Sequence, residues 1–286
     1  MKKWHTDTQY FWKINVGQTI IVVFLQPILI MEQNIENLRL IKKLERLLLK
    51  AIEEYRLIEE DDKILIGLSG GKDSLALLDL LGHRMCIYKP RFSLVAAHIS
   101  MNNVAYESDS SYLQQQTEAL GIPFVNKDTA FDASTDKRKS PCFLCSWYRR
   151  KALFDIAKEL GCNKIALGHH QNDILQTLLM NLTFQGSFST MPPKLRMSKF
   201  DMTIIRPMCL ISEEQIQELA RIKAFRPQKK RCPHEHSSNR PGMKSILQQL
   251  EQMNPQARYS LWRSMTHIQP EYLPFNEKTN IKQNLI

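Results

Sequence analysis

The sequence predicts an α/β fold: a doubly wound, mostly parallel sheet with an N-terminal helix and a basic C-terminal extension. Two observations lead to this prediction. From residue 63 onward, short apolar runs alternate with stretches of helical periodicity, and glycine or proline stands at most of the turns. Strand–helix–strand crossovers of this kind are right-handed and place parallel strands side by side with helices on both faces. A chain of 286 residues, 43% of them hydrophobic, is long enough to bury such a core.

The individual elements follow from the apolar patterns in chain order. Residues 64–68 read as the first strand, and the next helix covers residues 74–81, with Gly82 placed to end it. Further strands are expected at 92–99, 124–126, 164–167 and 202–205. Further helices are expected at 110–120, 147–160, 173–181, 212–220 and 243–253.

The N-terminus departs from this alternation. An apolar run at residues 20–30 follows three lysines but is too short to span a bilayer. Met31 then opens an amphipathic stretch, which predicts an N-terminal helix over residues 31–60. We expect residues 1–30 to be a dispensable or mis-assigned N-terminal extension. A packed N-terminal arm is the alternative.

Charge and cysteine content narrow the class of protein. The formal net charge is +10, and residues 191–286 hold 16 basic and 8 acidic side chains, whereas residues 31–190 hold 20 of each. Such asymmetry favours a polyanionic partner, with nucleic acid first. The six cysteines do not have the spacing of a disulfide framework, so we expect a cytoplasmic protein with reduced thiols and no membrane association.

The most informative segment follows the first strand directly. It is a glycine turn flanked by serines, with one lysine and one aspartate, at a predicted strand-to-helix junction. Glycines there let backbone N–H groups approach an anion, and the new helix N-terminus adds a favourable dipole. The spacing is not that of a Walker loop. The sequence therefore predicts a phosphate-binding loop made of Ser69, Gly70, Gly71, Lys72, Asp73 and Ser74.

A second polar segment follows the strand at 164–167. Gly168 opens the turn and Asp173 lies at the start of the next helix, so both are expected at the carboxyl edge of the sheet, where ligands bind. Asp173 is a carboxylate, which could bind Mg²⁺, whereas the adjacent amide of Asn172 is expected only to hydrogen-bond. His98, at the end of the second strand, is a weaker candidate near the nucleotide base; a structural role is equally open.

Cys142 and Cys145 form a CxxC pair in basic surroundings. Six basic side chains and no acidic one lie between residues 137 and 151, and this positive field favours thiolates. Cys232, in another basic stretch, is the expected third ligand. An iron–sulfur cluster, a zinc site completed by His234, and a metal-free persulfide site all remain open. The other three cysteines are expected in or near the core.

These segments together resemble the PP-loop ATP pyrophosphatases, whose SGGxDS signature matches residues 69–74. Within that superfamily the chain is similar to the tRNA 2-thiocytidine synthetases over roughly residues 40–275. The CxxC followed by Arg149-Arg150, the Gly168-His169-His170 turn and Ile205-Arg206-Pro207 carry that closer resemblance. The family usually has consecutive aspartates and then a glutamate where this chain has Asn172, Asp173 and Gln176, and amides bind Mg²⁺ less strongly than carboxylates. The resemblance therefore implies Asp173 as the Mg²⁺ ligand.

The resemblance implies a Rossmann-like fold and an ATP-dependent tRNA sulfurtransferase. The C2 oxygen of an anticodon-loop cytidine would be adenylated and then replaced by sulfur. The implied catalytic residues are Lys72, Asp73, Asp173, Cys142 and Cys145. The implied nucleotide-binding residues are Ser69, Gly70, Gly71, Lys72, Asp73, Ser74, His98 and Gly168.

The cofactors implied are ATP, Mg²⁺ and a [4Fe-4S] cluster held by Cys142, Cys145 and Cys232, with zinc as the alternative. An ATP-binding domain with an inserted CxxC loop is expected over 61–222, and a basic tRNA-binding segment over 223–286. The partners would be tRNA, a sulfide donor derived from a cysteine desulfurase, and a second copy of the chain. The phosphates of tRNA would be bound by Lys194, Arg196, Lys199, Arg221, Lys223, Arg226, Lys229, Lys230 and Arg231.

Three alternatives remain at this point. One is a PP-loop enzyme that thiolates a different base of tRNA, and another is a PP-loop amidating ligase. The third is a zinc-bearing RNA-binding protein whose ATP site has decayed, which the amides at positions 172 and 176 would suit.

Overall fold

The computed structural model divides into two compact units. It describes residues 3–6, 9–16, 19–24, 26–87, 89–102, 109–130, 141–198, 200–226 and 239–274, with side chains from residue 32 on except at Pro141. One unit comprises Met1–Gln171 and Pro193–Cys232, and the other comprises Asn172–Pro192 and Pro233–Ile286. The domain division expected from the sequence, at residues 61 and 223, stays a prediction.

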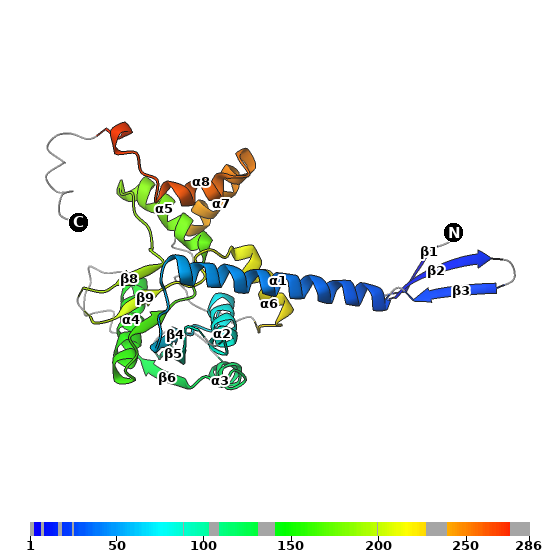
Figure 1. Cartoon of the computed structure of the whole chain (residues 1–286), viewed down its shortest axis with the longest axis horizontal. Helices are drawn as coiled ribbons and strands as arrows, with labels where there is room; N and C mark the ends of the chain where they lie inside the picture. The colour runs from blue at the N-terminus through cyan, green and yellow to red at the C-terminus, as the bar shows by residue number, and fades with distance from the viewer. Residues whose placement is uncertain are drawn as a thin grey trace. The chain divides into compact units, whose positions relative to one another are not determined.

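A six-stranded sheet lies in the first unit (Figure 1). Its order is β6-β5-β4-β7-β9-β8, and every neighbouring pair is parallel except β8 and β9. The strands are β4 (Asp62–Gly67), β5 (Phe92–Met101), β6 (Phe124–Thr129), β7 (Lys164–Ala166), β8 (Lys194–Arg196) and β9 (Thr203–Ile205). The predicted fold class is confirmed. The sequence did not predict the edge strand β8, because two of its three residues are basic.

The sheet is buried between helices, as its apolar strands require. Leu65 of β4 and Ile165 of β7 belong to a buried cluster with Ile156 of α4 (Pro141–Glu159). Ile64 and Ile66 are fully buried and point to the opposite face, because successive side chains of a strand alternate. Burying each such side chain contributes about 1.5–3 kcal/mol to stability. The apolar runs of the sequence therefore form a core on both faces of the sheet.

Helix α2 (Lys72–Met85) corrects one expectation from the sequence. Gly82 was expected to end this helix, but the helix continues to Met85. A Cβ atom on Gly82 would lie 2.9 Å from Cδ1 of Leu120 and 3.3 Å from Cδ1 of Ile122. The glycine therefore permits close packing against the segment that precedes β6, and it does not act as a helix stop.

Two further helices of this unit have side-chain caps at their N-termini. Asp109 caps α3 (Ser110–Glu118) by accepting a hydrogen bond from the amide of Tyr112 at 3.0 Å. Ser212 and Gln215 form a reciprocal capping box at α6 (Glu213–Ile222). Such caps satisfy backbone donors that the helix leaves open and contribute about 1 kcal/mol each. Both helices agree with the ranges expected from the sequence.

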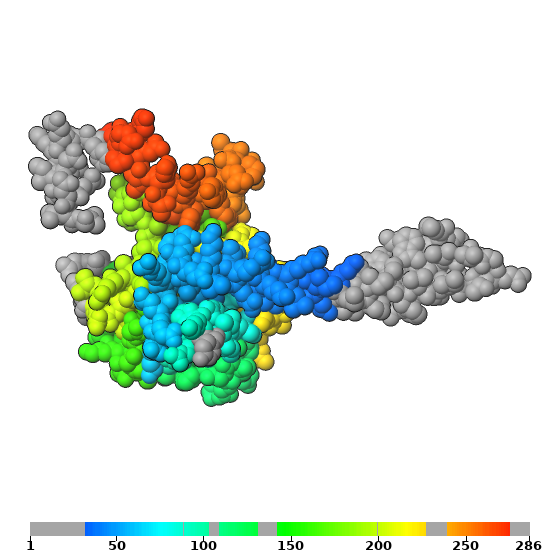
Figure 2. Space-filling model, in the orientation of Figure 1, coloured from blue at the N-terminus to red at the C-terminus, as the bar shows by residue number. Residues whose placement is uncertain are grey.

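The N-terminal region forms a helix and a small separate sheet. β1 (Lys3–Thr6), β2 (Gln9–Val16) and β3 (Thr19–Phe24) make an antiparallel sheet in the order β1-β2-β3. Helix α1 (Gln26–Glu54) begins before Met31 and buries Leu44 and Leu48. Its later turns lie against α2 (Figure 2). That residues 1–30 are dispensable stays a prediction.

Helices form the second unit. Its described elements are α5 (Gln171–Gln185), α7 (Arg240–Met253), α8 (Ala257–Ser264) and the 3-10 turn η1 (Pro270–Tyr272). The sequence predicted α5 and α7 but not α8. None of the helices in the described part of the chain is both long and apolar enough to cross a membrane.

Candidate active site

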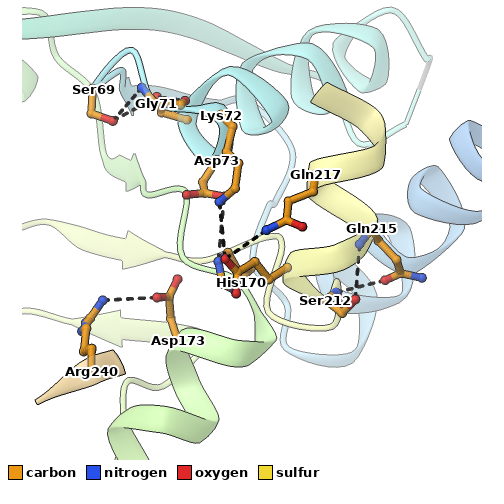
Figure 3. A network of polar contacts seen from close by, with 12 residues as sticks. Ser69, Gly71, Lys72, Asp73, His170, Asp173, Ser212, Gln215, Gln217 and Arg240 are labelled. Atoms are coloured by element: carbon orange, nitrogen blue, oxygen red, sulfur yellow. Dashed lines mark hydrogen bonds and ion pairs between the residues drawn. The ribbon is translucent and has the colours of Figure 1, made fainter. Parts of the chain in front are cut away.

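The glycine-rich loop lies between β4 and α2 (Figure 3). Ser69 Oγ donates to Ser74 Oγ at 3.1 Å, and Ser74 Oγ donates to the carbonyl oxygen of Gly71 at 2.9 Å. Gly70 has a φ of +82°, a conformation that favours glycine. Gly71 occupies the N-cap of α2, where it offers no side chain to cap the helix. The loop backbone and the helix N-terminus therefore suit an anionic ligand.

The loop flanks the point where the strand order of the sheet reverses. β4 pairs with β5 on one side and with β7 on the other, and doubly wound sheets bind ligands beside such a reversal. The turn after β7 approaches the loop closely. A Cβ on Gly168 would lie 3.0 Å from the backbone carbon and oxygen of Asp73 and 3.1 Å from the nitrogen of Ser74. The structure thus brings together the two turns that the sequence singled out.

Lys72 and Asp73 begin α2 and form an ion pair, with 2.9 Å between Nζ and Oδ1. Nε2 of His170, a buried side chain, lies 3.8 Å from the same carboxylate oxygen (Figure 3). Nζ of Lys72 is also 3.9 Å from Oε1 of Glu213, at the start of α6. An ammonium group and an imidazole therefore face the carboxylate that would otherwise repel a phosphate. These contacts explain how an aspartate fits into an anion-binding loop.

His169 contacts a different strand end. Nε of Arg206, a buried residue directly after β9, donates to Nδ1 of His169 at 3.3 Å. This bond joins the turn after β7 to the turn after β9. Each histidine thus has a polar partner at the carboxyl edge of the sheet, and His169 holds two strand ends in register.

His98 of β5 contacts the backbone of the residue that precedes the phosphate loop. It is 1% exposed, and its Nδ1 lies 2.7 Å from the carbonyl oxygen of Leu68, the residue before Ser69. A carbonyl only accepts hydrogen bonds, so Nδ1 donates. Burial lowers the pKa of His98, and the charge of Arg149 lowers it further. A neutral His98 therefore positions the entry to the loop, and its predicted contact with the nucleotide base stays a prediction.

The start of α5 carries a polar network of the second unit. Asn172 is 2% exposed, and its Oδ1 accepts a hydrogen bond from Nη1 of Arg258 at 2.6 Å. Arg258 is held in turn by both carboxylate oxygens of Glu251, at 2.7 and 3.1 Å. Oδ1 of Asp173 lies 3.2 Å from Nη1 of Arg240, the first residue of α7 (Figure 3). Asn172 thus hydrogen-bonds to Arg258, and its expected lack of a role at Mg²⁺ stays a prediction.

Sequence reasoning did not find Arg240 and Arg258. They are 67 and 86 residues beyond their partners, so no local pattern joins them to α5. Gln176, one turn after Asn172, is also buried. The two positions where the family usually has carboxylates are thus interior amides of a helical unit. Asp173 remains the carboxylate at this end of α5.

The CxxC pair corrects another expectation. It was expected in a loop before a helix starting at residue 147, whereas α4 starts at Pro141 and contains Cys142 and Cys145 in its first turns. Cys142 is exposed and Cys145 is partly exposed, and their i, i+3 spacing places them on one side of the helix. Both can therefore ligate a metal from the same side.

The third expected ligand, Cys232, lies outside the described residues, as do His234 and Lys229–Arg231. Within the described ranges, no three His, Cys, Asp or Glu side chains gather as a metal site. Two solvent-accessible thiols on one side of α4 nevertheless suit metal ligation, and Arg149 follows Cys145 by one helical turn. The described part of the chain thus fits a cluster or zinc site that needs at least one further ligand.

The remaining cysteines divide into two groups. Cys162 and Cys209 are buried, as expected, and burial raises the pKa of both thiols, to about 12 for Cys209. Cys86 was expected in or near the core but is exposed. It is the C-cap of α2, and its Sγ lies 3.6 Å from the carbonyl oxygen of Gly82. The expected burial of Cys86 was wrong, because the residue lies at the exposed end of the helix and not on its buried side.

Several of the basic residues expected to bind tRNA have partners within the chain. Lys223 forms an ion pair with Asp79 at 2.9 Å, and Arg221 pairs with Glu218 at 2.5 Å. Arg226 lies 4.8 Å from the ring of Tyr112 and 3.6 Å from a carboxylate oxygen of Asp109. These three charges are therefore partly neutralised. Lys194 and Arg196 lie on the edge strand β8.

The doubly wound sheet with this phosphate loop defines a PP-loop protein, and residues 40–248 match the family model described as the PP-loop domain. The chain is 39% identical over 198 residues to a tRNA-cytidine(32) 2-sulfurtransferase of Neisseria meningitidis serogroup C, which covers 68% of this chain and 61% of that relative. It is 35% identical over 242 residues to the tRNA-cytidine(32) 2-sulfurtransferase of Pseudomonas syringae, covering 82% and 87%. This chain belongs to the tRNA-cytidine(32) 2-sulfurtransferase family.

A solved structure supports the same placement. The U34-tRNA thiolase NcsA from Methanococcus maripaludis, solved with its [4Fe-4S] cluster, is 27% identical with a TM-score of 0.63. The similarity covers 80% of each chain. The resemblance to the PP-loop proteins and to the tRNA 2-thiocytidine synthetases is confirmed by the family model and the curated relatives, and the solved structure agrees with it in fold and in being a tRNA thiolase.

Proposed function

We propose that this protein is an ATP-dependent sulfurtransferase that converts a cytidine of the tRNA anticodon loop to 2-thiocytidine. The observation that carries the proposal is its 35% identity to a tRNA-cytidine(32) 2-sulfurtransferase over 87% of that relative's length. The loop at residues 69–74 and the cysteines at the start of α4 supply the two kinds of site that such a reaction needs.

Adenylation is the first step. ATP phosphates bind the backbone of the loop and the N-terminus of α2, and Lys72 stabilises the charge that develops on them. The C2 oxygen of the cytidine attacks the α-phosphorus, and the bond to the leaving pyrophosphate breaks. Asp73 and Asp173 are the carboxylates proposed for Mg²⁺, which prefers oxygen ligands and usually binds through one or two of them plus phosphates. Catalysis here rests mainly on positioning and charge stabilisation.

Sulfur transfer is the second step. Sulfide adds to C2 of the adenylated base and AMP leaves with the former oxygen. A [4Fe-4S] cluster held by Cys142, Cys145 and Cys232 would supply the place where that sulfide is bound. Arg149, one helical turn after Cys145, brings positive charge towards the negative charge that metal-bound thiolates carry. The fit of two thiols from one helix turn supports a cluster, and zinc completed by His234 is the alternative.

The partners follow from the reaction and from the charge distribution. We infer that tRNA is bound by the basic C-terminal third and that sulfide comes from a cysteine desulfurase in the cytoplasm, where thiols stay reduced. A homodimer is part of the same proposal. Neutralising Lys229, Lys230 and Arg231 should weaken tRNA binding, lower its dependence on salt and leave ATP affinity unchanged.

The direct test is pyrophosphate release from ATP with unmodified tRNA, followed by nucleoside analysis of that tRNA. The proposal expects release that depends on tRNA and a new 2-thiocytidine when sulfide is added to anaerobically purified protein. Release without a thionucleoside would favour another PP-loop enzyme acting on tRNA. No release would favour an RNA-binding protein with a decayed ATP site, which the buried amides Asn172 and Gln176 would then explain.

The metal is tested on the same preparation. Anaerobic protein that contains iron and acid-labile sulfide in equal amounts supports the cluster, whereas stoichiometric zinc without iron contradicts it. Cys142→Ser and Cys145→Ser should each lose the metal, while Cys209→Ser, at a fully buried thiol in the turn after β9, should keep it.

A further inference from the structure

The solvent-facing side of α4 combines aromatic and basic side chains next to the CxxC pair. Phe143 is 45% exposed and Trp147 is 46% exposed, and Arg150 and Lys151 are also exposed. Residues 143, 147 and 151 follow one another at i, i+4 spacing, so they lie on successive turns of one helix face. We refer to Phe143, Trp147, Arg150 and Lys151 as the α4 stripe.

The α4 stripe is not needed to hold the helix in place. The core contacts of α4 come from Leu144, Ala152, Ile156 and Ala157, which are at most 8% exposed. An indole that leaves nearly half of its surface in solvent contributes little to that core. Exposed tryptophan is uncommon on a surface without a binding role, because the large ring gains more from burial than from contact with water.

The indole of Trp147 is oriented by its neighbours. The ring of Tyr148 meets it edge-on at 4.9 Å between centroids, and Nζ of Lys151 lies 5.7 Å from its centroid. An ammonium at that distance is attracted to the ring face. A ring that is already ordered loses less conformational entropy on binding, which suits a stacking surface.

The charge around the ring selects an anion that also has flat apolar faces. No Asp or Glu occurs between residues 141 and 154, whereas Arg149, Arg150 and Lys151 are all basic. The positive field extends inward, since Arg149 is one of the causes that lower the pKa of His98. Phosphates beside unpaired bases have this combination of properties, and single-stranded loops are recognised by stacking on aromatic rings beside basic groups.

The α4 stripe and the CxxC pair lie at the same end of α4. At 1.5 Å rise per residue, Trp147 lies about 3 Å along the axis from Cys145 and about 7.5 Å from Cys142. Around the axis, at about 100° per residue, Trp147 is about 160° from Cys145 and about 140° from Cys142, so Trp147 and the thiols lie on opposite sides of the same end of the helix. A loop that stacks a base on Trp147 would therefore have to extend around the helix to reach the thiols.

We propose that the α4 stripe binds the anticodon loop of tRNA, with Trp147 stacking on an unpaired base and with Arg150 and Lys151 binding the adjacent phosphates. This inference rests on the proposed function, because it assumes that the substrate is a tRNA loop. It goes beyond that function by assigning the base-holding contact to a helix of the first unit and not to the basic C-terminal third.

The test is binding of an anticodon stem-loop RNA to the full chain, with Trp147→Ala, Trp147→Phe and a matched control. Stacking is worth about 1–3 kcal/mol per base by alanine substitution, so Trp147→Ala should raise Kd by about tenfold, while Trp147→Phe should stay within about threefold of the wild type. Leu38→Ala removes an apolar side chain of α1 that is 57% exposed, somewhat more than Trp147, and should change nothing. A duplex RNA of the same length should bind all four proteins alike.

Charge gives an independent readout. The double variant Arg150→Gln, Lys151→Gln should reduce the slope of log K against log salt by about 1.4, the value for two contacts to single-stranded phosphates. ATP affinity and thermal stability should stay at wild-type values in all variants, which separates lost RNA binding from misfolding. If Trp147→Ala were misfolded, the Phe variant and the charge variant would still decide the question.

The two proposals fail in different ways. If the wild type binds and thiolates tRNA but Trp147→Ala binds the stem-loop with unchanged Kd, the stacking contact is wrong and the sulfurtransferase stands. If the charge variant keeps the full salt slope, the phosphate contacts are wrong. If the wild type does not bind the stem-loop at all, both the inference and the proposed function are refuted.

Discussion

Replacing Gly168 with alanine tests the close approach between the turn after β7 and the phosphate loop. The added Cβ would lie 3.0 Å from the backbone carbon and oxygen of Asp73, whereas ordinary contacts begin at 3.4 Å. Moving from 3.0 to 3.4 Å requires a shift of about 0.4 Å in one of two backbone segments. The φ of Gly168 lies outside the left-handed region, so the perturbation is steric alone.

The expected effects follow from that shift. Overpacking of this kind costs typically 1–3 kcal/mol, and about 2 kcal/mol corresponds to a Tm lower by roughly 4–8 °C in a protein of this size. A displacement of 1 Å in a catalytic site can cost about a hundredfold in rate, so a shift of about 0.4 Å should slow pyrophosphate release by about five- to tenfold.

The assay pairs thermal unfolding with tRNA-dependent pyrophosphate release. Gly242→Ala is the matched control, because an added Cβ there meets no atom within 4 Å in the described structure and alanine is the better helix former in α7. That variant should keep full activity with an unchanged or slightly higher Tm. Wild-type Tm and rate in Gly168→Ala would refute the close packing of the two turns.

Three further predictions concern single side chains. In chelator-treated protein at about pH 8, iodoacetamide should modify the exposed Cys142 well before the buried Cys209. Iodoacetamide reacts with the thiolate, and burial raises the pKa of Cys209 to about 12. Equal rates of modification in peptide mass mapping would contradict this. Lys164→Met should lower the free energy of unfolding, measured with denaturant, by about 3–5 kcal/mol. The reason is that the buried carboxylate of Asp62, 2.6 Å from Nζ of Lys164, would lose its cation, so adding Asp62→Asn should restore part of the loss. Burial lowers the pKa of His98 below its ordinary value of 6.5, so at mildly acidic pH the unfolded chain binds a proton more readily than the folded chain does. The free energy of unfolding should therefore fall as the pH drops through about 6.5 towards the folded pKa. His98→Gln should show a smaller change of Tm over that range, and an equal change would argue against the buried neutral imidazole.

Local patterns were enough to predict the part of the site that binds phosphate. The loop at residues 69–74 and the turn at Gly168 each sit at a strand–helix junction, and parallel strands place all such junctions on one edge of the sheet. Their meeting therefore follows from topology. The ranges of β4, β5, α3 and α6 were predictable for a similar reason, because each has its own apolar period and its own end signals.

Contacts between distant segments were not predictable. Gly82 has the residue type of a helix stop, yet its role depends on Leu120, which lies beyond the next strand and helix. Arg258 is joined to Asn172 by tertiary packing alone. The start of α4 at Pro141 was not predicted, because the apolar period that marks this helix begins only at Trp147.

The polar contacts at the start of α5 also set an order of events during synthesis. α5 is made long before its partners, because Arg240 and Arg258 follow Asp173 and Asn172 by 67 and 86 residues. At 5–20 residues per second, a ribosome needs roughly 4–17 s to add 86 residues. Throughout that interval the contacts of Asn172 with Arg258 and of Asp173 with Arg240 cannot form, because the two arginines have not yet been added. The strands before and after α5 along the chain, β7 and β9, can pair before α7 and α8 are made. The polar contacts at the start of α5 therefore form last, although α5 lies in the middle of the sequence.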